Sequence, residues 1–139
     1  MAQMAWDTGP IPVMEKARDD SDWFKAIVFS AIQLERYGYL AIKGYFEHLK
    51  VNAEVIDKIL KRIHLIQIAE YLLAIGKINS EEFETIKQIN EERNSFMHRR
   101  DTKRFQRGKD ADRKYKPLAN KAIRILEEKL NVERLHISK

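Results

Sequence analysis

The sequence predicts an all-α protein, a small antiparallel four-helix bundle, from its composition and from the spacing of its apolar residues. Only five of the 139 residues are glycine and three are proline, while 34% are charged, a composition typical of long helices with short connections. Apolar residues recur every three or four positions, and no useful stretch alternates as a half-buried strand would. A chain of this length is expected to form one domain with its own core.

The helical domain is expected to span residues 21–131, between a flexible N-terminal arm, residues 1–20, and a C-terminal tail, residues 132–139. Pro10 and Pro12 argue against a helix in the arm, because proline restricts the backbone and lacks an N–H donor. The arm also carries apolar residues that could pack on a neighbouring surface, so an ordered arm is the alternative.

Four helices are expected, over residues 21–49, 52–76, 79–100 and 110–131. Asn52 and Asn79 are suitable N-caps, and Gly76 is a suitable C-terminal stop. Pro117 is expected either to break the fourth helix or to delay its start. The apolar residues of the first helix cover nearly its whole circumference, which indicates burial on more than one side.

The sequence contains no cysteine, which excludes disulfides, thiolate zinc sites and cysteine nucleophiles. His48, His64 and His136 show no metal-ligand spacing, so we expect neither a metal nor a cofactor. No apolar stretch is long enough to span a membrane, and residues 1–20 lack the pattern of a signal peptide. We therefore expect a cytoplasmic protein without membrane contact.

The net charge of +5 is distributed unevenly along the chain. Residues 1–98 carry 12 basic and 15 acidic side chains, whereas residues 99–116 carry nine basic and three acidic ones. Clustering of this kind is typical of a surface that binds a polyanion. A solvated, mobile basic loop is the alternative.

The third predicted helix carries an arginine where leucine would suit a plain core. On a wheel of about 100° per residue, Arg93 lies in the middle of the apolar stripe, and Asn90, Asn94 and His98 follow one edge. A buried arginine is costly unless it is paired, so this face is expected to line a polar cleft or a subunit interface. There Arg93 could bind phosphate and stabilise charge on it, while His98 moves protons near neutral pH. These residues could together cleave a phosphodiester without a metal.

A structural role for the same residues is the alternative. Arg93 could pair within the core with Glu35 or Glu70, each of which lies in an otherwise apolar helical segment. His98 could simply favour the C-terminal end of its helix, where a cation is stabilised by the helix dipole.

The sequence Arg93-Asn94-x-x-x-His98, near the end of a helix, resembles the signature of the HEPN family (higher eukaryotes and prokaryotes nucleotide-binding). That signature is an arginine followed a few residues later by a histidine, often with a polar residue directly after the arginine. The preceding residues 86–92 also resemble the family's lead-in to the motif. The resemblance extends over about residues 20–131 and is closest to short, stand-alone, DUF4145-like members.

This resemblance implies a metal-independent endoribonuclease that acts as a homodimer, with two copies of the motif facing each other across a shared cleft. Arg93 and His98 would be catalytic, and Asn94 would match the polar position. The ribose 2′-hydroxyl would be the nucleophile, leaving a cyclic phosphate. Many stand-alone members are toxins paired with a nucleotidyltransferase-like antitoxin. Others have lost activity and bind a nucleotide, RNA or a partner protein.

Basic residues directly after His98 are expected to hold RNA phosphates, which would give affinity without sequence recognition. An acidic partner protein would suit them equally. Tyr115, which lies near these charges in sequence, is expected to pack in the core rather than to stack on bases. The predicted RNA-binding residues are Arg99, Arg100, Lys103, Arg104 and Arg107.

Overall fold

The computed structural model describes residues 9–98 and 108–133, and these residues form only helices and connections, as the sequence predicts. The predicted RNA-binding residues 99–107 lie outside the described residues. The helices are α2 (Pro10–Asp19), α3 (Trp23–His48), α4 (Ala53–Leu60), α5 (Leu65–Ala74), α6 (Ser80–His98), α8 (Lys109–Arg124) and the short π-helix η1 (Ile125–Lys129).

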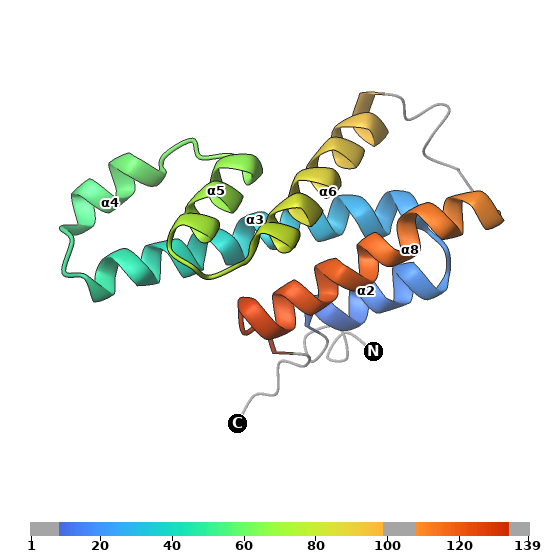
Figure 1. Cartoon of the computed structure of the whole chain (residues 1–139), viewed down its shortest axis with the longest axis horizontal. Helices are drawn as coiled ribbons and strands as arrows, with labels where there is room; N and C mark the ends of the chain where they lie inside the picture. The colour runs from blue at the N-terminus through green and yellow to red at the C-terminus, as the bar shows by residue number, and fades with distance from the viewer. Residues whose placement is uncertain (1–8, 99–107, 134–139) are drawn as a thin grey trace, which may run out of the picture.

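The long helix α3 is the axis of the molecule, and each of the other described α-helices packs against it (Figure 1). Helices α2 and α8 pack together along one half of α3, while α4 and α5 lie at the other end. Helix α6 lies between these two groups and contacts both α5 and α8. The described residues thus contain six α-helices rather than the predicted four, because the arm includes a helix and the second predicted helix is divided.

The expectation of a flexible, non-helical arm is wrong for residues 10–19, which form α2. Pro10 and Pro12 lie in its first turn, where the backbone N–H groups have no partner within the helix and a missing donor costs nothing. Ile11 and Met14 are buried in the core, and Arg18 Nη1 donates a hydrogen bond to Asn120 Oδ1 over 3.0 Å. Helix α2 is therefore an integral layer of the fold.

The second predicted helix is divided at residues 61–64. Asn52 caps α4 as predicted, since its Oδ1 accepts a hydrogen bond from the Glu54 N–H over 2.8 Å. Helix α4 ends where Lys61 becomes extended, and the next residue, Arg62, is left-handed with φ of 63°. Helix α5 begins after His64, whose backbone N–H donates to Gln67 Oε1 over 2.8 Å. His64 therefore stands at a helix start.

The third and fourth predicted helices form close to the expected positions. The Glu82 N–H donates to Asn79 Oδ1 and the Asn79 N–H donates to Glu82 Oε1, so a reciprocal capping box begins α6. Pro117 neither breaks nor delays α8, which begins at Lys109 and continues past the exposed proline ring. No helix in the described part of the chain is long and apolar enough to cross a membrane.

Helices α3 and α5 approach each other closely at Gly38. A β-carbon at this position would lie 2.5 Å from Ile68 Cγ2 and 3.3 Å from Leu72 Cδ1. Any larger residue at position 38 would collide with α5, so packing requires glycine here. The backbone of Gly38 is ordinary α-helix, so its conformation alone would allow other residues. The contact fixes how α5 lies on α3, and α5 in turn packs against the first half of α6.

Candidate functional site

The motif predicted from the sequence occupies the last two turns of α6, at the end of that helix that points away from α5 (Figure 1). Asn94 and His98 are exposed, and Arg93 is partly buried. Residues four apart share a helical face, so Asn90, Asn94 and His98 form one row, with Arg93 beside it. The predicted polar edge of the helix is therefore present and accessible.

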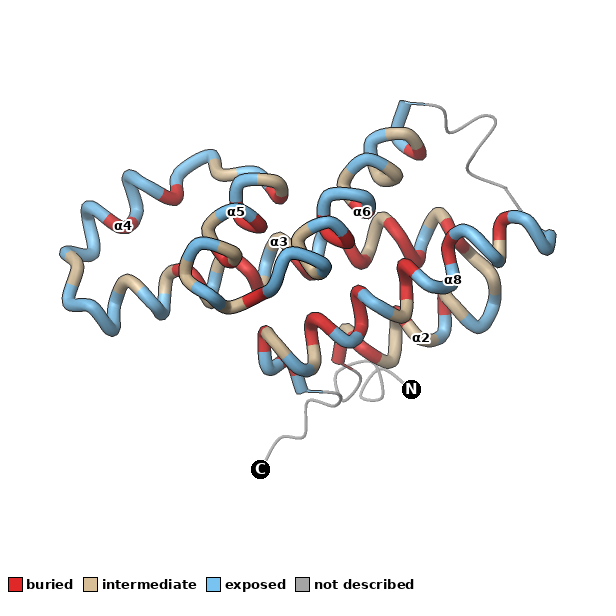
Figure 2. Tube along the Cα trace, in the orientation of Figure 1, coloured by how far each residue is buried: buried red, intermediate tan, exposed pale blue. Residues whose placement is uncertain are grey.

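The helical wheel predicted Arg93 at the centre of the buried face of α6, and this prediction is wrong. The fully packed positions of α6 are Thr85, Ile86, Ile89 and Phe96, whereas Met97 is 55% exposed (Figure 2). The wheel counted Met97 as part of the apolar stripe, but no other element of residues 9–98 and 108–133 buries it. Arg93 consequently lies at the border between the packed and the exposed sides.

The predicted structural partners of Arg93 do not pair with it. Arg93 Nη2 donates a hydrogen bond to Asn90 Oδ1 over 2.6 Å, and within the described residues the guanidinium forms no ion pair with Glu35 or Glu70. Glu35 lines a hollow between α3 and the residues Ile63 and Ile68, and Glu70 is exposed on α5. Arg93 is only partly buried and donates to a side-chain amide, so its position does not require a core carboxylate.

An aromatic cluster anchors the end of α6 to the rest of the fold. Phe96 is completely buried and meets the ring of Phe24 edge-on, with centroids 5.7 Å apart. The ring of Tyr115, on α8, lies 5.3 Å from Phe96 and 6.2 Å from Trp23. Tyr115 is also fully buried, as predicted, so it is unavailable for stacking on bases.

Glu92 ties the same turn of α6 to α8 by polar contacts. Tyr115 Oη donates a hydrogen bond to Glu92 Oε1 over 3.2 Å, and Lys114 Nζ lies 3.3 Å from Glu92 Oε2. Burial of the phenol, together with the charge and hydrogen bond of Glu92, raises the pKa of Tyr115 well above its ordinary range. The tyrosine is therefore neutral at physiological pH and acts as a fixed donor. No feature of the sequence singled out Glu92.

Further basic side chains are exposed on α8, next to the motif-bearing helix. A hollow of about 490 Å³ is lined by three of them, Lys109, Arg113 and Lys116, together with Pro117 and the polar Asp112 and Asn120. Asp112 Oδ1 already accepts a hydrogen bond from Trp23 Nε1 over 2.9 Å. The remaining exposed basic side chains of α8 are Lys114, Lys121 and Arg124.

The site is formed by Asn90, Arg93, Asn94 and His98. Within residues 9–98 and 108–133, no three histidine, aspartate or glutamate side chains gather as a metal site would require. The chemistry available at the end of α6 is a guanidinium, two amides and an exposed imidazole. Such a set can bind an anion and exchange a proton.

Comparisons with known proteins add no relative to this description. No protein-family model, no curated protein and no solved structure matches the chain. The resemblance to the HEPN family therefore rests on the residues of the motif and on their place near the end of a helix.

Proposed function

We propose that this protein is a metal-independent endoribonuclease of HEPN type, with Arg93, Asn94 and His98 as its reactive groups. The observation that carries the proposal is that Arg93 is bound by an amide and not by a carboxylate of the described residues. Its hydrogen bond to Asn90 is to a neutral amide, and among the described residues no carboxylate neutralises it. The guanidinium thus keeps its charge available for a phosphate, about one and a half helical turns from an exposed histidine.

The proposed reaction is an internal transesterification of RNA. His98 accepts the proton of the ribose 2′-hydroxyl, and the freed oxygen attacks the adjacent phosphorus. The bond from phosphorus to the 5′-oxygen breaks, that oxygen takes up a proton, and a 2′,3′-cyclic phosphate remains. Arg93 stabilises the negative charge that grows on the phosphate oxygens, and Asn94 contributes an amide beside it.

A homodimer with a shared cleft is part of this proposal, since the resemblance implies that two motifs face each other. His98 of one copy would then act together with the partner's Arg93 across the shared cleft. The exposed position of His98 suits completion by a second molecule. We extend the proposal to a cytoplasmic toxin that a nucleotidyltransferase-like antitoxin holds inactive.

The cations near the motif support RNA as the substrate. Exposed basic side chains follow α8, and Arg99, Arg100, Lys103, Arg104 and Arg107 lie between the motif and that helix in sequence. Contacts of this kind bind phosphates regardless of sequence and weaken as the salt concentration rises. The proposal therefore predicts affinity for RNA with little sequence preference.

The test is incubation of the purified chain with RNA in the presence of EDTA. Cleavage should persist, the products should carry cyclic-phosphate ends, and Arg93→Ala should abolish both. His48→Ala, which removes an exposed histidine at the far end of α3, is the matched control and should cleave normally. Intact RNA in every reaction would exclude the nuclease.

The second candidate is a non-catalytic module that binds RNA, a nucleotide or a partner protein. It is favoured by the exposed cations of α8, which can hold an anion without help from the motif. Binding of RNA without cleavage, unchanged in His98→Ala, would support this candidate over the nuclease.

A further inference from the structure

We infer that Asn90 is a positioning residue of the site, in addition to the three proposed reactive groups. Its side-chain amide holds the guanidinium of Arg93 in one orientation. Because the amide is neutral, it leaves the charge of Arg93 available to an anion. The inference rests on the proposed function for the identity of that anion. Two of its three tests need no cleavage of RNA, so the two proposals can fail separately.

Asn90 and Arg93 lie three positions apart on α6, which places their side chains next to each other on one face of the helix. Arg93 Nη2 donates to Asn90 Oδ1 over 2.6 Å, and both residues are partly buried. Because the donor is ionised, this bond is stronger than one between two neutral groups. Asn90 therefore constrains the far end of a side chain that has many rotamers.

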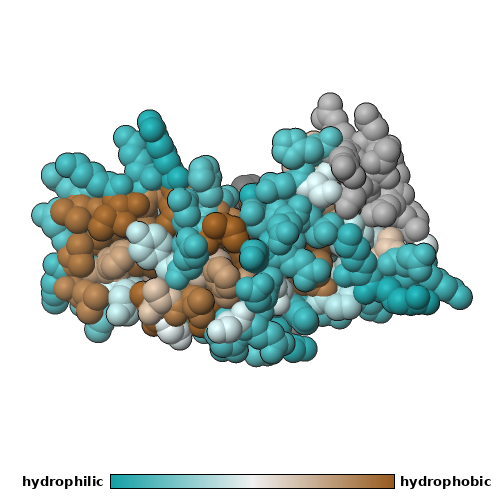
Figure 3. All heavy atoms as spheres, turned by 45° about the horizontal axis from the view of Figure 1, so that its top comes forward, coloured by the Kyte–Doolittle hydropathy of each residue, from teal (hydrophilic) through white to brown (hydrophobic). Residues whose placement is uncertain are grey.

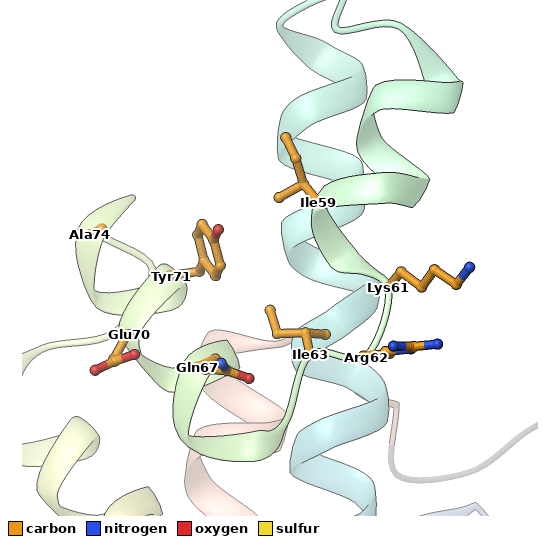
Figure 4. A pocket seen from close by; sticks show the side chains of 8 residues that line it. All are labelled: Ile59, Lys61, Arg62, Ile63, Gln67, Glu70, Tyr71 and Ala74. Carbon is orange, nitrogen blue, oxygen red and sulfur yellow. The ribbon is translucent and has the colours of Figure 1, made fainter.

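Carboxylates near α6 in the fold do not take the place of Asn90. Glu70 lines a hollow between α5 and residues 59–63 (Figure 4). Glu92, which precedes Arg93 in sequence, contacts α8 through the hydroxyl of Tyr115. Among the described residues, the amide of Asn90 is thus the hydrogen-bond partner of the guanidinium.

The surface around this pair is open to a polar ligand. Asn94 and His98, in the same helical row as Asn90, are exposed. Figure 3 shows a largely hydrophilic surface over the half of the molecule that contains α6 and α8. A guanidinium has five N–H donors, and the bond to Asn90 uses one of them. The remaining donors still include a pair that can bind two phosphate oxygens at once.

Orientation and charge make separate contributions to such a site. An arginine that is already held loses less conformational entropy when a phosphate binds, and it meets the phosphate in a defined geometry. Aspartate at position 90 would accept the same hydrogen bond but would neutralise the guanidinium. Alanine would leave the charge of Arg93 intact and release its orientation. Variants at this one position therefore distinguish the two contributions.

The first test measures the orientation of Arg93 by NMR of the arginine side chains in the isotope-labelled full chain, without a ligand. Rotation of its guanidinium should be at least about tenfold faster in Asn90→Ala than in the parent, since a hydrogen bond to a charged group is worth about this factor. Gln88→Ala, which removes an exposed amide from the same helix, is the matched control and should rotate as the parent does. Equal rates in the parent and in Asn90→Ala would overturn the inference.

The second test adds inorganic phosphate and follows the same signal of Arg93. The signal should shift in the parent, and Asn90→Asp should need at least about tenfold more phosphate for the same shift, because the new carboxylate neutralises the guanidinium. Asn90→Gln, which keeps a neutral amide, should respond more nearly as the parent does. Circular dichroism should show the parental helical content in each variant. A parent that does not respond to phosphate, or an equal response in Asn90→Asp, would overturn the inference.

The third test uses RNA and depends on the proposed nuclease. At saturating protein, Asn90→Ala should cleave about 10- to 100-fold more slowly than the parent, because a misplaced group costs about this much in rate. Its affinity for RNA should be unchanged, which a general loss of structure would not allow. Cleavage by Asn90→Ala at the parental rate would overturn the inference. Intact RNA in every reaction, the parent included, would instead contradict the nuclease, and the first two tests would still decide the role of Asn90.

Discussion

The hydroxyl of Tyr115 donates a hydrogen bond to Glu92 Oε1 over 3.2 Å, and this bond joins α8 to the turn of α6 that carries Arg93. Tyr115 is fully buried, and the side chain of Glu92 is 14% exposed. Lys114 lies 3.3 Å from the other carboxylate oxygen. The contact sets the position of the motif relative to the basic helix α8.

Removing the hydroxyl of Tyr115, which donates to Glu92, should destabilise the fold. Tyr115→Phe leaves Glu92 Oε1 without its phenolic donor in a largely buried place, so we expect a loss of about 1–2 kcal/mol in the free energy of unfolding. Lys114→Ala removes a partner that is 44% exposed and should cost less than about 1 kcal/mol. Urea denaturation measures both, and equal stability of Tyr115→Phe and the parent would exclude a structural role for this bond.

The same tyrosine should make the fold sensitive to alkaline pH. Its pKa is raised above the ordinary value of 10.0, so above that pH the unfolded chain loses the phenolic proton while the folded chain retains it. The contribution of Tyr115 to the free energy of unfolding is fully present below pH 10. Above pH 10 it falls by up to about 1.4 kcal/mol per pH unit. Between pH 9 and 11, the free energy of unfolding measured by denaturation should decline less steeply in Tyr115→Phe than in the parent or in Tyr39→Phe. Identical slopes would count against the raised pKa.

Two glycines of α3 provide a matched test of the packing against α5. Gly38→Ala should destabilise by about 1–2 kcal/mol, because the new methyl group meets the stiff, branched side chain of Ile68. Gly44→Ala meets nothing within 4 Å and should stabilise by about 0.5–1 kcal/mol through helix propensity. Thermal unfolding of the two variants should therefore shift in opposite directions. A stabilising Gly38→Ala would show that α3 and α5 leave room for a methyl group between Gly38 and Ile68.

The shared cleft can be tested by mixing inactive variants. Arg93→Ala retains His98, and His98→Ala retains Arg93, so a mixed dimer holds one of each across the cleft. After co-refolding, the mixture should recover part of the parental cleavage while each variant alone remains inactive. A mixture as inactive as its components would indicate that each copy uses only its own motif.

Local signals in the sequence predicted the helix starts well. Asn52 and Asn79 cap helices as expected, because capping depends on bonds to residues only two or three positions away. Pro10 and Pro12 misled the prediction, since proline is tolerated in the first turn and only the following residues reveal whether a helix continues. The break at Lys61 and Arg62 was missed because neither residue type is a usual signal for the end of a helix or for a left-handed conformation.

The candidate site could be predicted in its location but not in its contacts. The wheel correctly grouped Asn90, Asn94 and His98 on one edge of α6, since helical geometry alone determines that relation. It could not show that Asn90, rather than Glu35 or Glu70, binds Arg93, because that depends on how helices distant in sequence pack. For the same reason it gave no indication of the bond between Glu92 and Tyr115.

The central claim is that His98 performs chemistry on RNA, and the most direct test is the cleavage rate in EDTA at saturating protein. We predict that His98→Ala binds RNA as the parent does but cleaves it at least about 100-fold more slowly, since a positioned acid or base contributes at least this much. Cleavage by His98→Ala at the parental rate, with equal binding, would contradict the account.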